Sequence, residues 1–468
     1  MPIHGAKVTR LLFRVGRTGL PPCATPAGRS AAEGKDLLFA PEGPADVAQG
    51  GSPVRPIADR VILIGVVAVL LAFAPALRAA DWPVWRGPKG DGVVTDAAVP
   101  TKWSATKNVV WKVEVPGTGH SSPVVSNGRV FLTSFDSSTN DRVLLCFDRT
   151  DGKLLWKKSV LSAAAGKMHK NNTPASSTPA SDGTHVWVTF LDGAKIAVAC
   201  YDFAGKQTWL KTFDGFDSRH GFCGTPVLFG DLLVVNGDSD GDAFLAALDK
   251  KTGETKWKTE RPNRVRSFSV PLFVEVKGKP QMVLAGSKSV AAFEPTTGKQ
   301  LWVADSTTDK FVATVAFTEG LIFATGTSPN STLVAIDPTG TGNVTKSHTK
   351  WSDTKTAAYV PSPLAFGKHL FVMSDSGVAT LLEAKSGKKL WSERLGSRLH
   401  HASPLLINGL IYCIADDGST FVVKPGDEYE LVAKNALGVE CHATPAVSDG
   451  QLFVRSAAHL WCLGAKRP

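Results

Sequence analysis

Three histidines occupy the same position in a repeated sequence unit, and imidazoles gathered in this way have the chemistry of a metal or ligand site. Nearly every copy of the unit opens on a proline, and His120, His401 and His442 each lie three residues before it. The other copies carry different residues at this position, namely Ser176, Cys223, Phe268, Val312 and Val360. Imidazole is a common ligand of Zn²⁺ and Cu²⁺. If the three copies are neighbours in space, their histidines could bind a divalent transition metal.

Further ionisable side chains fall in the same segments between copies. They are His400, His220, Cys441 and Arg219, together with His169. Such side chains could instead hydrogen-bond an anionic or quinone-like small molecule, or a peptide. A third alternative is that they only line a hydrated channel. The sequence leaves these alternatives open and identifies no catalytic residue.

A calcium site is a further candidate, between the second and third predicted strands of the third copy. Asp238, Asp240 and Asp242 alternate there with Ser239 and Gly241. Alternating carboxylates suit Ca²⁺, but the helix–loop–helix calcium pattern needs an acidic residue where Ala247 stands. The match is partial, and an acidic turn without a metal explains the pattern as well.

The elements that must position these residues are indicated by a recurring tryptophan. It returns every 40 to 53 residues, usually behind a phrase of the type Asp-x-x-Thr-Gly. The seven copies are Trp111, Trp156, Trp209, Trp257, Trp302, Trp351 and Trp391. A period in this range indicates copies of one supersecondary unit packed side by side.

One copy, residues 121–157, reads as four short strands. Asn127-Gly128 is a two-residue hairpin turn, because both residues accept the positive φ that such a turn requires. Residues 150–153 make a later turn. Pro123 opens the first strand, where the missing N–H is tolerated on a sheet edge. Four antiparallel strands with turns at this spacing are typical of a propeller blade.

The copies number eight, and the eighth is divided between the two ends of the chain. Residues 443–463 supply three strands, and residues 108–113 supply a fourth. Their pairing would close the ring and remove two open sheet edges. We therefore predict an all-β fold, an eight-bladed β-propeller of four-stranded antiparallel blades over residues 108–465, with an extended segment at 81–107. In such a ring the copies that carry His401, His442 and His120 are neighbours.

The N-terminal part of the chain has a different character. Residues 1–60 are rich in Ala, Gly, Pro and Arg, and are predicted to be a disordered leader, with a start codon assigned too far upstream. An uninterrupted apolar run follows at 61–77, between Arg60 and Arg78. We interpret 61–80 as a signal peptide, or else as an uncleaved membrane anchor. Both predict export to the periplasm or cell envelope of a bacterium.

Charge and cysteine usage exclude other classes of function. The net charge of +10 is scattered through turns rather than clustered with aromatic residues, which argues against nucleic-acid binding. The seven cysteines include no Cys-x-x-Cys pair, and disulfide pairing cannot be read from the sequence. Cys146 and Cys200 share one strand position, which favours buried thiols. We expect the propeller to be monomeric.

The phrase from Ala247 through Asp249 to Trp257 resembles the repeat of the pyrroloquinoline-quinone (PQQ)-type propellers. The resemblance covers about residues 105–465 and implies that the seven tryptophans dock against neighbouring blades. The stretch 81–88, which reads Asp-Trp-Pro-Val-Trp-Arg-Gly-Pro, is similar to exported bacterial members of this superfamily.

Two branches of this superfamily imply different functions. The quinoprotein dehydrogenases hold PQQ and Ca²⁺ at the channel mouth, but their adjacent Cys-Cys pair is missing here. The outer-membrane assembly scaffold is non-catalytic and presents its propeller to protein partners. We therefore predict an exported binding or assembly scaffold of the cell envelope, with envelope proteins or peptides as partners. The alternative is a PQQ-dependent oxidoreductase, for which PQQ or a divalent metal would be the cofactor.

Overall fold

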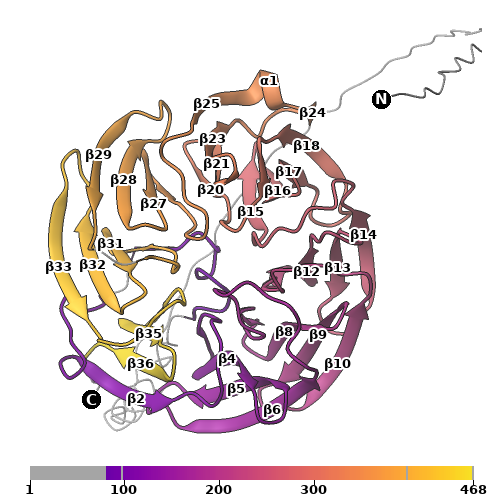
Figure 1. The fold of residues 1–468 in the computed structure, drawn as a ribbon, viewed down its shortest axis with the longest axis vertical. Coiled ribbons are helices and arrows are strands. Elements are labelled where there is room, and N and C mark those ends of the chain that lie inside the picture. The colour runs from indigo at the N-terminus through magenta and orange to yellow at the C-terminus, as the bar shows by residue number, and fades with distance from the viewer. Residues whose placement is uncertain (1–80, 96–97, 397–398, 466–468) are drawn as a thin grey trace, which may run out of the picture. The chain divides into compact units, whose positions relative to one another are not determined.

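Eight small antiparallel sheets form a ring in the computed structural model, which describes residues 81–95, 98–396 and 399–465 (Figure 1). The predicted all-β, eight-bladed propeller is confirmed. The predicted leader and the signal peptide or anchor lie outside the described residues. Among the residues that are described, no helix is long and apolar enough to cross a bilayer.

Each blade has four strands in antiparallel order, and blades are numbered here from the sheet that begins at β3. The first strands border the channel and are β3 (Val124–Ser126), β7 (Ala180–Ser181), β11 (Val227–Phe229), β15 (Leu272–Val276), β20 (Ala316–Thr318), β26 (Leu364–Phe366), β30 (Leu405–Ile407) and β34 (Ala446–Ser448). The second strands are β4 (Arg129–Asp136), β8 (His185–Asp192), β12 (Leu232–Gly237), β16 (Lys279–Gly286), β21 (Leu321–Gly326), β27 (His369–Met373), β31 (Leu410–Ile414) and β35 (Gln451–Arg455).

The outer half of each blade is more exposed. The third strands are β5 (Asp141–Asp148), β9 (Lys195–Asp202), β13 (Phe244–Asp249), β17 (Ser289–Phe293), β23 (Thr332–Ile336), β28 (Val378–Glu383), β32 (Ser419–Lys424) and β36 (His459–Leu463). The fourth strands are β6 (Leu154–Ser162), β10 (Gln207–Phe213), β14 (Thr255–Glu260), β18 (Gln300–Asp305), β25 (Thr349–Asp353), β29 (Lys389–Arg394), β33 (Glu430–Ala436) and β2 (Val109–Glu114).

Short elements complete the structure. Strand β1 (Val93–Val94) adds to blade seven, and β24 (Gly342–Asn343) adds to blade four. Strands β19 (Thr308–Lys310) and β22 (Ser328–Pro329) pair with each other beside blade five, and α1 (Thr345–His348) is a single turn before β25.

Blade eight draws its strands from both ends of the described chain. Strand β2 pairs antiparallel with β36, so that Trp111 lies opposite Cys462, and β36 pairs in turn with β35. Blades seven, eight and one therefore follow one another around the ring (Figure 1).

Local sequence explains how each blade begins. Strand β3 starts directly after Pro123, and β30 and β34 start directly after Pro404 and Pro445. The hairpin turn that follows β3 has φ of 44° at Asn127 and 76° at Gly128, the conformation that favours these two residue types.

The recurring tryptophan docks on the turn of the next blade. The indole of Trp111 lies so close to Gly152 that a Cβ there would meet it at 2.7 Å, which explains the glycine. Six indoles donate a hydrogen bond of 3.0–3.1 Å to a turn carbonyl of the following blade; the pairs are Trp111 with Arg149, Trp156 with Phe203, Trp209 with Lys250, Trp257 with Pro295, Trp351 with Ala384 and Trp391 with Gly426.

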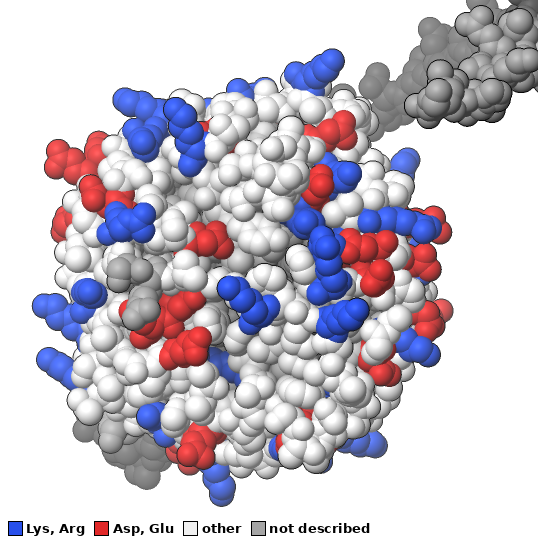
Figure 2. Space-filling model, viewed as in Figure 1, with Lys and Arg blue, Asp and Glu red and all other residues white. Residues whose placement is uncertain are grey.

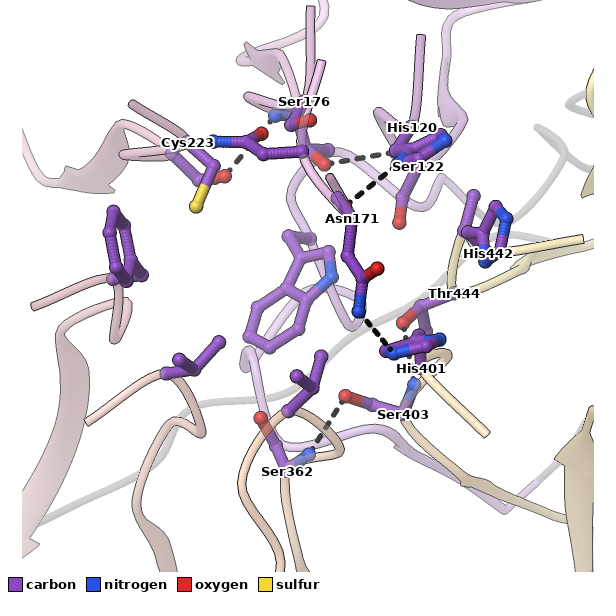
Figure 3. Close-up of a pocket in the computed structure, with 18 of the residues that line it drawn as sticks. His120, Ser122, Asn171, Ser176, Cys223, Ser362, His401, Ser403, His442 and Thr444 are labelled. Carbon is purple, nitrogen blue, oxygen red and sulfur yellow. Dashed lines mark hydrogen bonds between the residues drawn. The ribbon is translucent and has the colours of Figure 1, made fainter. Parts of the chain in front are cut away.

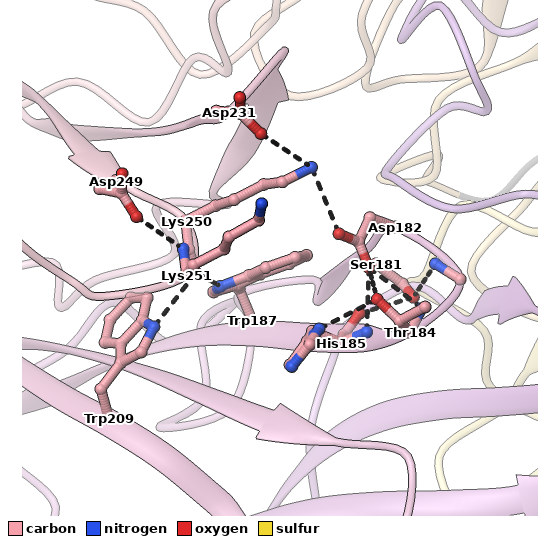
Figure 4. Close-up of polar contacts among 11 residues, drawn as sticks. Ser181, Asp182, Thr184, His185, Trp187, Trp209, Asp231, Asp249, Lys250 and Lys251 are labelled. Carbon is pink, nitrogen blue, oxygen red and sulfur yellow. Dashed lines mark hydrogen bonds and ion pairs between the residues drawn. The ribbon is translucent and has the colours of Figure 1, made fainter.

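Figure 4 shows one of these junctions. The carbonyl of Lys250 accepts from both Trp209 and Trp187, while the ammonium of Lys250 pairs with Asp182 and Asp231. The carboxylate of Asp249 accepts backbone N–H groups of the same turn, which explains the Asp of the repeated phrase.

Trp302 differs from the other six. Its indole N–H donates to Gln281 within the same blade, at 2.8 Å, and Gln281 donates to the carbonyl of Pro338 in the next blade. Trp302 is fully buried in a cluster with Ile322 and Ile336 of blade five. Blades four and five are thus joined through a glutamine and apolar packing.

A second set of links runs around the channel at the residue before the repeated proline. The backbone N–H of this residue in one blade donates, at 2.9–3.2 Å, to the hydroxyl of its equivalent in the next blade. The donor–acceptor pairs are Ser122–Thr178, Thr178–Thr225, Val270–Thr314, Thr314–Ser362, Ser362–Ser403 and Ser403–Thr444. We call this set the hydroxyl belt. It explains why Ser or Thr recurs at this position.

Residues 81–94, which we call the strap, cross the centre of the ring (Figure 1). Trp82 exchanges backbone hydrogen bonds with Val125 of blade one. The buried Arg86 donates to the carbonyl of Pro363 in blade six, and Gly92 accepts from Leu406 in blade seven. The strap therefore spans the channel and gives it a floor of protein.

Candidate functional site

A cavity of about 310 Å³ lies at the end of the channel where the first strands begin. All eight residues located three positions before the repeated proline, or before Val315 in its place, line this cavity; they are His120, Ser176, Cys223, Phe268, Val312, Val360, His401 and His442. Figure 3 labels His120, Ser176, Cys223, His401 and His442 among them. Trp85 also lines it. Because Trp85 belongs to the strap, we take it as the floor of the cavity.

Three imidazoles lie together on one side of the cavity. The ring of His442 is 4.5 Å from that of His120 and 5.6 Å from that of His401, between ring centroids. Their blades are one, seven and eight. Distant parts of the chain meet here because β2 and β36 share a sheet.

Asp416 joins two of these imidazoles. Its Oδ2 lies 2.6 Å from Nδ1 of His401 and 3.6 Å from Nδ1 of His442, and its Oδ1 accepts the backbone N–H of His401. Burial opposes ionisation of this carboxyl, but hydrogen bonds from His401 and His442 outweigh it and lower the pKa of Asp416. The same contact, with help from Glu440, raises the pKa of His442.

His120 has a different electrostatic environment. Burial, the neighbouring His442 and the buried Arg455 lower the pKa of His120 to about 4. Its Nδ1 lies 3.3 Å from the carbonyl oxygen of Asn171. The imidazole of His120 is therefore neutral at physiological pH.

His169 and His220 also line the cavity, and their rings are 5.3 Å apart. The cations nearest His220 are the buried Arg266, together with Lys310 and Arg219, whereas the carboxylates of Asp416 and Glu440 lie beside His442. Figure 2 shows acidic groups over blades seven and eight, and lysine and arginine interspersed with further acidic groups across the mouth.

Three of the predicted site residues lie away from the cavity. His400 is fully buried, with Nε2 near the carbonyl of Leu395, and Cys441 is buried with its thiol near the carbonyl of Val439. Arg219 is exposed and does not line the cavity. His220 does line it.

The carboxylates of the predicted calcium loop are each paired with an arginine. Asp238 binds Arg261 through both oxygens, at 2.9 and 3.3 Å, and is completely buried. Asp240 pairs with Arg266, and Asp242 pairs with Arg264 at 3.7 Å. These contacts give the three carboxylates a structural role in holding the loop.

Sequence reasoning missed Asp416, Asp375 and Trp85. Asp375 and Asp416 occupy equivalent places in blades six and seven, two residues after the second strand and two before a glycine. Asp375 accepts the N–H groups of Tyr359 and Val360, as Asp416 accepts that of His401. The repeated Asp-x-Gly was the signal that could have identified both carboxylates.

We expect the free energy of unfolding to decrease as the pH is lowered, in part because of His220. Its pKa falls from 6.5 to about 4, through burial first and then through Arg266, His169, Lys310 and Arg219. In the unfolded chain, His220 binds a proton below its ordinary pKa of 6.5, whereas in the folded chain it does so only near pH 4. The stability that neutral His220 contributes is therefore intact above pH 6.5 and is lost as the pH falls from 6.5 towards 4.

Urea denaturation of the wild type and of the His220→Asn variant at about pH 7 and about pH 5 measures this effect. Between the two pH values, we expect the urea midpoint of the wild type to fall further than that of the variant. An equal fall in both proteins would show that His220 does not cause the pH dependence.

Three comparisons relate the chain to known proteins. The sequence profile of the PQQ-like family described as outer membrane protein assembly factor BamB matches residues 92–168, 139–364 and 329–427. A polyvinylalcohol dehydrogenase of a Pseudomonas species is 25% identical over an alignment of 243 positions that covers 43% of this chain. The chain spans only 36% of that enzyme's length.

Two solved structures share the fold. BamB from Moraxella catarrhalis superimposes with a TM-score of 0.56 at 14% identity, over 77% of this chain and 98% of that protein. The computationally designed Ika8 protein superimposes with a TM-score of 0.54 at 13% identity, over 76% of this chain and 100% of the design.

The profile matches cover well over half of the chain, including most of the blades and their repeated phrase. The chain therefore belongs to the PQQ-like propeller family described as outer membrane protein assembly factor BamB.

Proposed function

We propose that this propeller is a non-catalytic binding scaffold of the bacterial cell envelope, and that the channel mouth is its binding surface. The cavity is the observation that carries this proposal. Its lining comes from all eight blades, and the strap lies beneath it. A pocket with a floor and a polar, aromatic wall can hold a small polar ligand or a peptide segment of a partner.

The state of the cavity's side chains favours binding over covalent catalysis. Hydroxyls that would serve as nucleophiles, such as those of Thr178, Ser362 and Ser403, accept backbone N–H groups in the hydroxyl belt. Burial raises the pKa of the Cys223 thiol to about 12, so that it stays protonated and a poor nucleophile.

The envelope location rests on two supports. The family description names outer-membrane assembly. The apolar run at 61–77 with its basic flanks suits an export signal. Protein partners at the membrane surface are the expected ligands of such a scaffold.

Site-specific photo-crosslinking tests the proposal in the producing bacterium. A photoreactive residue is placed at Lys170 or Glu440, both exposed at the mouth, and at Asn408 as the control. Asn408 lies in a turn that follows a first strand, at the opposite end of the channel. We expect one partner adduct of defined mass from the mouth positions. Equal adducts from Asn408, or none from the mouth, would contradict the proposal.

A PQQ-dependent oxidoreductase is the second candidate, and the match to a polyvinylalcohol dehydrogenase favours it. The cavity volume and the indole of Trp85 suit a flat aromatic ligand. The adjacent cysteine pair that the resemblance implies has no counterpart, since Cys223 is the one thiol among the described residues that lines the cavity. The fit to PQQ is therefore incomplete.

A titration of the purified protein with PQQ and Ca²⁺ separates the two candidates. The measurements are the absorbance of the quinone and the melting temperature. For a scaffold we expect no saturable change. Tight stoichiometric binding would favour the oxidoreductase.

A further inference from the structure

We propose that His401, Asp416 and His442 form a binding site for a divalent transition metal, with an open coordination position towards the cavity. One ligand atom from each residue lies within 4.8 Å of the others. Two imidazoles and a carboxylate are a donor set used for Zn²⁺ and for other first-row transition metals. This site is a separate property of the mouth and does not depend on which partner binds there.

The spacing of the donor atoms is close to what a metal needs. Ligands about 2.0–2.1 Å from a tetrahedral Zn²⁺ lie roughly 3.3 Å from one another. The distance of 3.6 Å between Asp416 and His442 is near this value, and the 2.6 Å hydrogen bond between Asp416 and His401 must open by less than an ångström. The remaining pair of donor atoms, those of His401 and His442, lie within 4.8 Å of each other.

Outer contacts orient both imidazoles in the way that metal-binding histidines are usually held. Nε2 of His442 lies 2.7 Å from a carboxylate oxygen of Glu440, which leaves Nδ1 free to coordinate. Nε2 of His401 lies 3.1 Å from the side-chain amide nitrogen of Asn171 (Figure 3). When His401 binds a metal through Nδ1, a reversed Asn171 amide presents its oxygen to the Nε2 proton.

The three groups are also accessible. Their side chains are 13%, 16% and 20% exposed for His401, Asp416 and His442, and both histidines line the cavity. A cation can enter from the mouth, and the acidic side of the mouth attracts it. With three protein ligands, a fourth position remains for water or for a donor atom of a bound ligand.

Isothermal titration of the full chain with Zn²⁺, after dialysis against a chelator, tests the site. We expect one Zn²⁺ per chain. His401→Ala and His442→Ala should each weaken binding by more than the roughly 10–100-fold that follows loss of an outer contact. Circular dichroism establishes that each variant is folded. If an alanine variant unfolds, His442→Gln takes its place. The visible spectrum of the Co²⁺-substituted protein then supplies a second measurement of metal binding.

Two matched controls come from the same cavity. His120 contacts His442 without a place in the proposed ligand set, and His220 lines the cavity beside His169. His120→Ala and His220→Ala should change the affinity for Zn²⁺ by less than about threefold, which is below the roughly 10–100-fold loss expected when a residue that hydrogen-bonds a metal ligand is removed. Absence of saturable binding, or equal losses in the controls, would overturn the site. Neither result affects the cross-linking test of the scaffold.

Discussion

Replacing Trp111 by alanine is expected to lower the free energy of unfolding by about 3–5 kcal/mol, as for other buried large-to-small aromatic substitutions. Trp111 is only 9% exposed, stacks on the Gly152 turn of blade one and donates to the carbonyl of Arg149. It also belongs to β2, the N-terminal strand of blade eight. Its loss therefore weakens the junction at which the two ends of the chain meet.

Urea denaturation of the purified protein measures this effect. Trp111→Phe keeps an aromatic ring but loses the hydrogen bond, and we expect a cost nearer 1 kcal/mol from that bond. Leu210→Ala is the control, because Leu210 also lies on a fourth strand but is 46% exposed, and it should change stability by at most about 0.5 kcal/mol. A Trp111→Ala variant as stable as the Leu210→Ala variant would show that this junction contributes little.

Replacing Asp238 by alanine is expected to cost about 3–5 kcal/mol, because it leaves the guanidinium of Arg261 buried without its counter-ion. The Asp238 side chain is completely buried and that of Arg261 is 5% exposed. Arg261 also donates to the carbonyl of Gly286, which ties the loop to blade four. A structural pair of this kind stabilises the protein equally with calcium or with a chelator.

Thermal melts with Ca²⁺ and with a chelator separate the structural role from a calcium site. Asp242→Ala is the matched control in the same loop, since Asp242 is 67% exposed and its pair with Arg264 should contribute at most about 1 kcal/mol. The double replacement Asp238→Leu with Arg261→Met should recover much of the lost stability, because no charge is left unpaired. A calcium-dependent rise in melting temperature that Asp238→Ala abolishes would contradict the structural role.

Repetition explains why the sequence predicted the fold and the position of the site. Equivalent residues of each copy take equivalent places, so an alignment on the proline predicts that His120, His401 and His442 lie in one ring. The hydroxyl belt and the tryptophan junctions follow the same logic, because each residue type is selected by a contact that recurs around the ring.

The sequence neighbours of these residues do not share their position. His400 and Cys441 adjoin His401 and His442 in sequence, yet both are buried away from the cavity. Consecutive side chains of an extended segment point to opposite sides, which turns His400 and Cys441 away from the cavity that His401 and His442 line. The partner of Trp302 was likewise not predictable from the repeat, because Gln281, which accepts the hydrogen bond of its indole, is not part of the repeated phrase.

The sequence by itself determined the blade, the number of blades and the ring of residues at the channel mouth, because these depend on local periodicity and on copy-to-copy equivalence. Only the tertiary structure decided which side chains meet across that ring. Asp416 reaches His401 and His442 from a separate turn, and Trp85 enters from a strap that the repeat does not include. Contacts between non-equivalent segments depend on the path of the chain through space, and a periodic pattern carries no information about that path.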